Sequence, residues 1–162
     1  MIYLIGGVGR AGKSYVARKI QKRLGISYFS TDWFPLPPII ELLFKMIANQ
    51  IDDGVSGVFE GTAITPRLFL LLRKNFREKI HGCFLGYKDL TAESKLEELE
   101  RNRIESGHKG WPDFPGMSET LVRGFIDESK RLYSECENHN ILYYEIDNIV
   151  GHTEKIISLL TA

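Results

Sequence analysis

Eight residues near the amino terminus have the types and the spacing that phosphate binding requires. Residues 7–14 read Gly-Val-Gly-Arg-Ala-Gly-Lys-Ser and match the phosphate-loop pattern G-x-x-x-x-G-K-[ST] at every fixed position. In this pattern the backbone N–H groups surround a phosphate, the lysine reaches the terminal phosphates and the hydroxyl binds Mg²⁺. We therefore expect a nucleotide-binding set that consists of the loop and the residue after it: Gly7, Val8, Gly9, Arg10, Ala11, Gly12, Lys13, Ser14 and Tyr15.

The sequence on either side of this segment predicts a strand before the loop and a helix after it. Residues 2–5 form a short apolar run that is typical of a buried parallel strand. Apolar residues then recur at helical spacing, at Val16, Ala17, Ile20 and Leu24. The loop would thus meet the positive end of a helix, with Ser14 as a metal ligand and Lys13 exposed before nucleotide binds. A glycine turn that only connects two elements is the alternative, and the agreement of strand, spacing, Lys-Ser pair and helix argues against it.

Two carboxylates follow or end predicted strands. Asp32 comes after the strand predicted at 26–30, where it could accept a proton from a hydroxyl or help to hold the water shell of Mg²⁺. Glu60 ends the strand predicted at 55–60 and could orient Mg²⁺ or hold a substrate. The alternatives are a turn or helix-cap role for Asp32 and a plain strand-end carboxylate for Glu60.

Arg101 and Arg103 stand near the end of a charged helix and just before a glycine- and proline-rich segment at 106–116. Arginines in this position could neutralise the charge that develops on a transferred phosphoryl group. They could equally complement the negative end of the helix and pair with neighbouring glutamates. We expect residues 101–117 to form a lid.

The charged helix itself is predicted at 91–103. Its apolar stripe is narrow and consists of Leu96 and Leu99, so we expect most of this helix to be solvated. A different pattern occupies residues 36–53, where apolar residues lie on more than one helical face. Such a helix is either deeply buried or covers a cavity, and we expect it to cover the substrate.

Predicted strands and helices alternate along the whole chain. This order favours an α/β fold in three layers, with a five-stranded parallel sheet, helices on both faces, and one domain spanning residues 1–162. Ligands of such sheets bind beyond the carboxyl ends of the strands. The phosphate loop, Asp32, Glu60 and Asp147 would therefore gather at one edge.

The composition of the 162-residue chain is ordinary for a globular protein, with 43% hydrophobic and 26% charged residues. The formal net charge is +0, so no overall field attracts nucleic acid, which is not expected as a partner. No segment resembles a signal peptide or a membrane span. We expect a cytoplasmic enzyme, monomeric or homodimeric, that acts on a small molecule.

The motifs together resemble the nucleoside-monophosphate-kinase-like group of P-loop kinases. The resemblance rests on residues 6–14, on Ser-Thr-Asp at 30–32 and on Phe-Glu-Gly at 59–61. Within this group the pattern is most similar to chloramphenicol phosphotransferase, gluconate and shikimate kinases, 2-phosphoglycerate kinase and the zeta-toxin kinases. The resemblance implies the P-loop NTPase fold with strand order 2-3-1-4-5, a mobile lid, and Mg²⁺ and ATP as cofactors.

The resemblance also implies roles for single residues. Asp32 would be the base, Arg101 and Arg103 the lid arginines, and the backbone near Asp147 would lie against adenine. The chain departs from the shikimate kinases because no second aspartate lies two residues from Asp32. The segment 33–51 is too apolar and too poor in arginine for a nucleotide monophosphate acceptor.

These observations predict an ATP- and Mg²⁺-dependent kinase that phosphorylates a hydroxyl of a metabolite, nucleoside, sugar or antibiotic. Lys13, Asp32, Arg101 and Arg103 would be its catalytic residues. A nucleotide monophosphate kinase is one alternative, and a P-loop ATP-binding regulator without kinase activity is another. A GTP switch is disfavoured because no Asn-Lys-x-Asp run is present.

Overall fold

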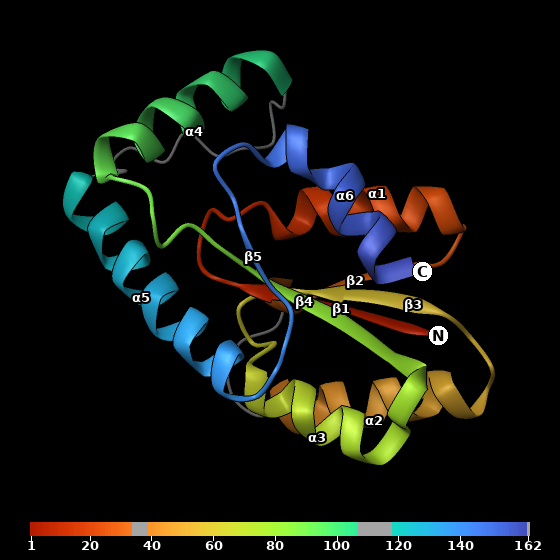
Figure 1. Ribbon diagram of the computed structural model, residues 1–162. Helices are drawn as coiled ribbons and strands as arrows, with labels where there is room; N and C mark the ends of the chain where they lie inside the picture. Colours follow the sequence, from red (N-terminus) through yellow and green to blue (C-terminus); the bar gives the residue numbers. More distant parts are fainter. Residues whose placement is uncertain (34–38, 107–117, 162) are drawn as a thin grey trace.

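The computed structural model describes residues 1–33, 39–106 and 118–161. Strands and helices alternate as predicted, except that two helices lie between the fourth and the fifth strand (Figure 1). The strands are β1 (Ile2–Gly7), β2 (Ser27–Ser30), β3 (Gly57–Glu60), β4 (Ile80–Gly86) and β5 (Tyr143–Glu145). The helices are α1 (Lys13–Leu24), α2 (Ile39–Asp52), α3 (Pro66–Phe76), α4 (Ala92–Ser106), α5 (Glu119–Asn138) and α6 (Ile149–Thr161), with short 3₁₀ turns at Thr31–Trp33 and Arg77–Lys79.

The five strands form one parallel sheet in the order β2-β3-β1-β4-β5, which confirms the expected topology. The central strand is β1, and its Ile5 lies opposite Glu60 of β3 and Cys83 of β4. All pairs run in the same direction, so the carboxyl ends of β1, β2 and β3 meet at one edge. The phosphate loop leaves the sheet at this edge.

Side chains point alternately to the two faces of each strand, so both faces of the sheet carry apolar residues. Helices cover both faces. Tyr3 and Ile5 belong to a buried cluster with α1 and α6, whereas Ile2 and Leu4 belong to a second cluster with α2 and α3. Figure 1 shows α1 and α6 on one side of the sheet and α2 and α3 on the other. Burial of each large apolar side chain stabilises the fold by roughly 1.5–3 kcal/mol. The three-layer architecture is therefore confirmed.

Helix α4 differs from its predicted orientation. Its buried residues include Lys95 and Glu98, whereas Leu96 and Leu99 are only half-buried. Most described side chains of α4 are exposed or half-buried, as expected, but its inner face is charged rather than formed by the two leucines. Hydrophobic periodicity cannot reveal such a face, because it counts charged residues as outward-facing.

A side-chain cap marks the beginning of the last helix. Helix α6 starts at Ile149, because the Asn148 side chain accepts a hydrogen bond from the Gly151 N–H at 3.3 Å and caps the first turn. Within the described ranges, no helix is long and apolar enough to cross a bilayer.

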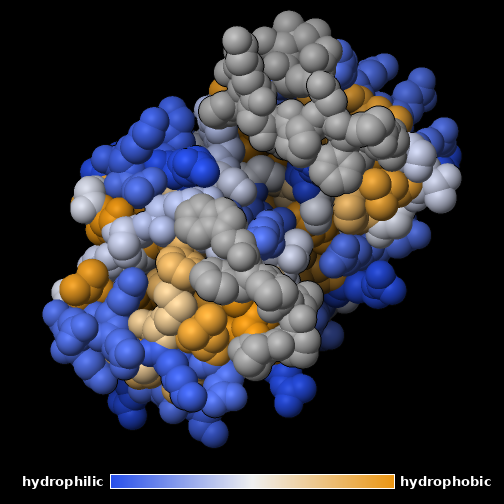
Figure 2. Space-filling model, turned by 180° about the vertical axis from the view of Figure 1, so that it is seen from behind, coloured by the Kyte–Doolittle hydropathy of each residue, from blue (hydrophilic) through white to orange (hydrophobic). Residues whose placement is uncertain are grey.

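Helix α2 corresponds to the helix predicted at 36–53, of which residues 36–38 lie outside the described residues. One face is buried through Ile39 and Leu43, but Ile40 and Leu42 are exposed. Figure 2 shows the side of the molecule opposite to Figure 1, where hydrophobic side chains lie in patches among hydrophilic ones. The role of α2 in covering a substrate remains a prediction.

The predicted lid is described only in part. Residues 101–106 are the last residues of α4, and residues 107–117 lie outside the described residues.

Candidate functional site

At two positions of the segment that joins β1 to α1, the backbone conformation and the close neighbours accommodate only glycine. Gly7 has a φ of 134°, and a Cβ added there would lie 2.2 Å from the Leu85 carbonyl oxygen. Gly12 has a φ of 85°, and its Cβ would lie 2.4 Å from Ile149. Both positions combine a left-handed conformation with close contact to a neighbouring element. The glycines of the motif therefore hold the loop tightly between β4 and the start of α6.

The first turn of α1 is open to an anion. Gly12 is the N-cap residue and supplies no side-chain hydrogen bond, and the first turn contains no acidic residue. The first N–H groups of a helix have no acceptor within the helix and carry partial positive charge. A phosphate in the loop would accept hydrogen bonds from N–H groups of this kind.

Lys13 lies inside this loop. Its Nζ donates a hydrogen bond to the Val8 carbonyl oxygen at 2.7 Å, and the residue is only 6% exposed. The expectation that Lys13 is exposed without nucleotide was wrong, because the side chain folds back over the loop. Burial lowers the pKa of Lys13, and the nearby carboxylates of Glu60 and Asp32 oppose this shift. The loop therefore holds a buried amine beside two acids.

Glu60 lies at the end of β3 and is 0% exposed. Its Oε1 accepts hydrogen bonds from the Ser14 hydroxyl at 3.0 Å and from the Tyr28 hydroxyl at 2.8 Å. Its Oε2 has no hydrogen-bond partner among the described residues. Burial and the bond to Glu60 raise the pKa of Tyr28 to about 12, so Tyr28 remains a hydrogen-bond donor. An unpartnered buried carboxylate oxygen beside a hydroxyl is a suitable place for a cation.

These oxygens fit Mg²⁺ bound together with a nucleotide. Within the described residues, no three His, Cys, Asp or Glu side chains gather closely enough to hold a metal ion. Mg²⁺ is commonly bound by one or two protein oxygens with substrate phosphates and water. Ser14 and Glu60 would supply the protein oxygens, and the ion would neutralise charge on the phosphates.

Asp32 lies at the same edge, in the 3₁₀ turn after β2. Its Oδ1 is 3.5 Å from the Thr62 hydroxyl, which donates to it, and the carboxylate is exposed. A Cβ added at Gly61 would lie 1.9 Å from the Thr31 Oγ1, which is buried and has no partner among the described residues. The Asp32 carboxylate is therefore accessible to a hydroxyl from solvent.

Asp147 lies between β5 and α6. Its Oδ1 is 2.5 Å from Nε2 of His152, and this hydrogen bond lowers the pKa of Asp147. The contact between Gly12 and Ile149 places this connection beside the start of α1. The segment at 147–149 therefore lies close to the carboxyl-terminal end of the phosphate loop.

The remaining predicted residues are placed as follows. Val8 and Ala11 are buried in the core, and Tyr15 is half-buried on α1. Arg10 has a φ of 61°, and partial burial lowers the pKa of its guanidinium. Arg101 is exposed on α4, and the Arg103 backbone belongs to the same helix while its side chain lies outside the described residues.

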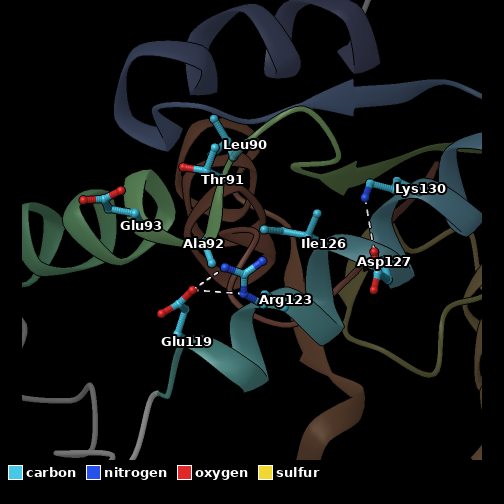
Figure 3. Close-up of a pocket in the computed structure, with 9 residues that line it drawn as sticks. All are labelled: Leu90, Thr91, Ala92, Glu93, Glu119, Arg123, Ile126, Asp127 and Lys130. Carbon is cyan, nitrogen blue, oxygen red and sulfur yellow. Dashed lines mark hydrogen bonds and ion pairs between the residues drawn. The ribbon is translucent and has the colours of Figure 1, made fainter.

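A separate cavity of about 370 Å³ lies between the start of α4 and α5 (Figure 3). Four of its charged side chains pair along α5, Arg123 with Glu119 and Lys130 with Asp127. The opposite side of α5 carries Phe125, which lies against Gly9 of the loop. The cavity is therefore distinct from the phosphate loop.

Solved structures with the same arrangement identify the fold. The chain is similar to shikimate kinase from Bacteroides thetaiotaomicron, with a TM-score of 0.60, 12% identity, and coverage of 100% of this chain and 99% of that chain. It is also similar to deoxyadenosine kinase from M. mycoides with bound dATP, with a TM-score of 0.54, 14% identity and coverage of 100% of both chains. The chain has the fold of the P-loop kinases.

A third P-loop kinase with this fold is a gluconokinase from Sinorhizobium meliloti. Its TM-score is 0.50 at 18% identity, over 77% of this chain and 72% of that chain. No protein-family model matches the sequence, and no curated protein matches it. The likeness to P-loop kinases is thus one of structure.

Sequence reasoning missed Tyr28 as a site residue. Tyr28 pairs with Val58, and Ser30 pairs with Glu60, so Tyr28 and Glu60 lie diagonally on one face of the sheet. The expected order of strands contained this signal, because it placed β2 beside β3. A tyrosine two residues before the end of β2 then faces the acid that ends β3.

Proposed function

We propose that this protein is an ATP- and Mg²⁺-dependent kinase that transfers the γ-phosphate to a hydroxyl group of a small molecule. The main support is geometric: Lys13 is buried in the phosphate loop, the same loop donates a hydrogen bond to the buried Glu60, and Asp32 follows β2 at the same edge of the sheet. A simple phosphate-binding turn needs neither acid. Phosphoryl transfer needs a cation-binding acid and a carboxylate that faces the acceptor.

Each residue would have one task. The loop amides and Lys13 would hold and stabilise the terminal phosphates, and Ser14 and Glu60 would hold Mg²⁺. Asp32 would align the acceptor hydroxyl and accept its proton. Arg101, or Arg103 on the same helix, would approach the phosphates when α4 closes.

The decisive experiment measures ADP release from Mg·ATP with a panel of acceptors. The panel contains shikimate, gluconate and deoxyadenosine, which the names of the similar structures point to, and further sugars, alcohols and nucleoside monophosphates. We expect one hydroxyl compound to accelerate ADP release and to yield a phosphate monoester by mass spectrometry. Acceleration by monophosphates alone would indicate a nucleotide kinase, and slow release that no acceptor changes would indicate a regulator.

A variant of Glu60 tests the proposed metal site. We expect Glu60→Gln to raise the Mg²⁺ concentration for half-maximal rate by about 10–100-fold, a range typical of altered metal environments. The reason is that glutamine keeps the shape and the contacts with Ser14 and Tyr28 but lacks the charge. The control is Glu135→Gln, an exposed change on α5. An unchanged Mg²⁺ titration in a folded Glu60→Gln variant would assign Glu60 to structure alone.

A further inference from the structure

Tyr87 connects the phosphate loop to the rest of the molecule. It directly follows β4 and is fully buried. Its hydroxyl donates to the Gly9 carbonyl oxygen at 2.7 Å, and its N–H donates to the Ser129 hydroxyl at 3.1 Å. Tyr87 is therefore fixed at both its backbone and its hydroxyl.

The bond to Gly9 determines how the middle of the loop is oriented. Because a trans peptide is planar, the direction of the Gly9 carbonyl also sets the direction of the Arg10 N–H, which points away from Tyr87. Arg10 has a φ of 61°, a left-handed conformation that non-glycine residues adopt only when the surroundings enforce it. Tyr87 supplies such a constraint. The shape of the phosphate loop thus depends on a tyrosine outside it.

Tyr87 in turn lies against a buried ion pair on α4. The Lys95 Nζ is 4.2 Å from the centre of the Tyr87 ring, a cation–π contact. Lys95 also pairs with Glu98, and their side chains are 1% and 4% exposed. Glu98 accepts a second hydrogen bond from Asn102 at 2.9 Å. A continuous set of contacts therefore runs from the loop through Tyr87 to the last turns of α4.

The ion pair is poorly explained by stability alone. Desolvation of two buried charges often cancels their attraction, and apolar replacements are frequently as stable. Close packing fixes the start of α4 only in part, because Ala92 is buried but Leu96 is half-buried, and a cavity of about 370 Å³ lies between this end of α4 and α5 (Figure 3). The polar contacts instead define which face of α4 turns inward. Arg101 lies about one turn after Glu98 on the same helix and is exposed.

We propose that Tyr87, Lys95 and Glu98 are positioning residues that couple the conformation of the phosphate loop to the position of α4. This inference rests on the proposed function, because the change in the position of α4 would follow the binding of nucleotide to the loop. Nucleotide binding would tighten the loop around Gly9, and Tyr87 would transmit the change to Lys95 and α4. Neither Tyr87 nor the ion pair needs to touch the substrate.

The test compares two matched double variants, Lys95→Met/Glu98→Leu and Lys130→Met/Asp127→Leu. The second removes an exposed pair of the same i,i+3 spacing on α5. Hydrogen exchange is measured with and without a non-hydrolysable ATP analogue and Mg²⁺. In the wild type and the control, we expect nucleotide to protect both the loop and α4. In the Lys95→Met/Glu98→Leu variant, we expect protection of the loop to remain and protection of α4 to be lost, with an unchanged unfolding midpoint.

The Tyr87→Phe variant provides a second test, because it removes the hydrogen bond to the loop and leaves the ion pair intact. Loss of one hydrogen bond to the loop should weaken binding of the ATP analogue by about 3–10-fold. Unchanged affinity, or equal protection of α4 in the wild type and the Lys95→Met/Glu98→Leu variant, would overturn the coupling. An absence of nucleotide binding in the wild type would overturn the proposed function as well, which distinguishes the two failures.

Discussion

Lys13→Met is expected to lower the rate of phosphoryl transfer by about 10²–10³-fold or more, the range seen when one preorganised charge-stabilising donor is removed. Methionine keeps the length and the apolar stem of the side chain but removes the amine. The measurement is ADP release at saturating Mg·ATP with the acceptor found in the panel. The effect should lie in kcat, because the amine acts most strongly on the charge of the transition state.

Burial of Lys13 adds a second consequence. Its amine donates to Val8, so methionine leaves the Val8 carbonyl oxygen without that donor, a loss of about 1–3 kcal/mol in the free energy of unfolding. Thermal unfolding must therefore accompany the rate measurement. The control is Lys22→Met, which changes an exposed lysine in the last turn of the same helix and should alter neither quantity. A folded Lys13→Met variant with wild-type turnover would remove the kinase assignment.

Asp32→Asn is expected to reduce turnover by about 10²–10⁴-fold, the usual contribution of a general base. Asparagine retains the size and the contact with Thr62 but cannot accept the proton of the acceptor hydroxyl. Affinity for the ATP analogue should change little, because the phosphate loop is intact. Stability should also be maintained, since Asp32 is exposed and its contact with Thr62 is long at 3.5 Å.

The matched control for this variant is Asp53→Asn. Asp53 is also exposed and also follows an ordered element, but it precedes β3 and so lies at the opposite edge of the sheet. Its replacement should leave turnover unchanged. If Asp32→Asn lost nucleotide binding and kept its turnover, Asp32 would belong to the metal environment or to the fold.

The sequence by itself determined the phosphate loop and the order of the elements. Gly7, Gly12, Lys13 and Ser14 have fixed spacing within a few residues, so local chemistry defines the loop. The alternation of Ile2 and Leu4 with Tyr3 and Ile5 similarly predicts a strand that is buried on both faces. Each of these patterns involves only residues that are close together in the sequence, so the sequence alone is enough to detect it.

The tertiary structure decided which distant side chains meet. Glu60 lies 32 positions from Tyr28, and Gly9 lies 78 positions from Tyr87, yet both pairs are hydrogen-bonded. The register of β2 beside β3 and of β1 beside β4 creates these contacts, and no local pattern encodes them.

The tertiary structure also buried two lysines that the sequence does not place inside the protein. Lys13 was expected to be exposed and is buried, and Lys95 lies on the inner face of a helix expected to be mostly solvated. Periodicity assigns a lysine to the solvent because burial of an unpaired charge is unfavourable. Here Lys13 finds the Val8 carbonyl and nearby acids, and Lys95 finds Glu98 and Tyr87. Only the folded chain brings those partners close enough to offset the desolvation of the two amines.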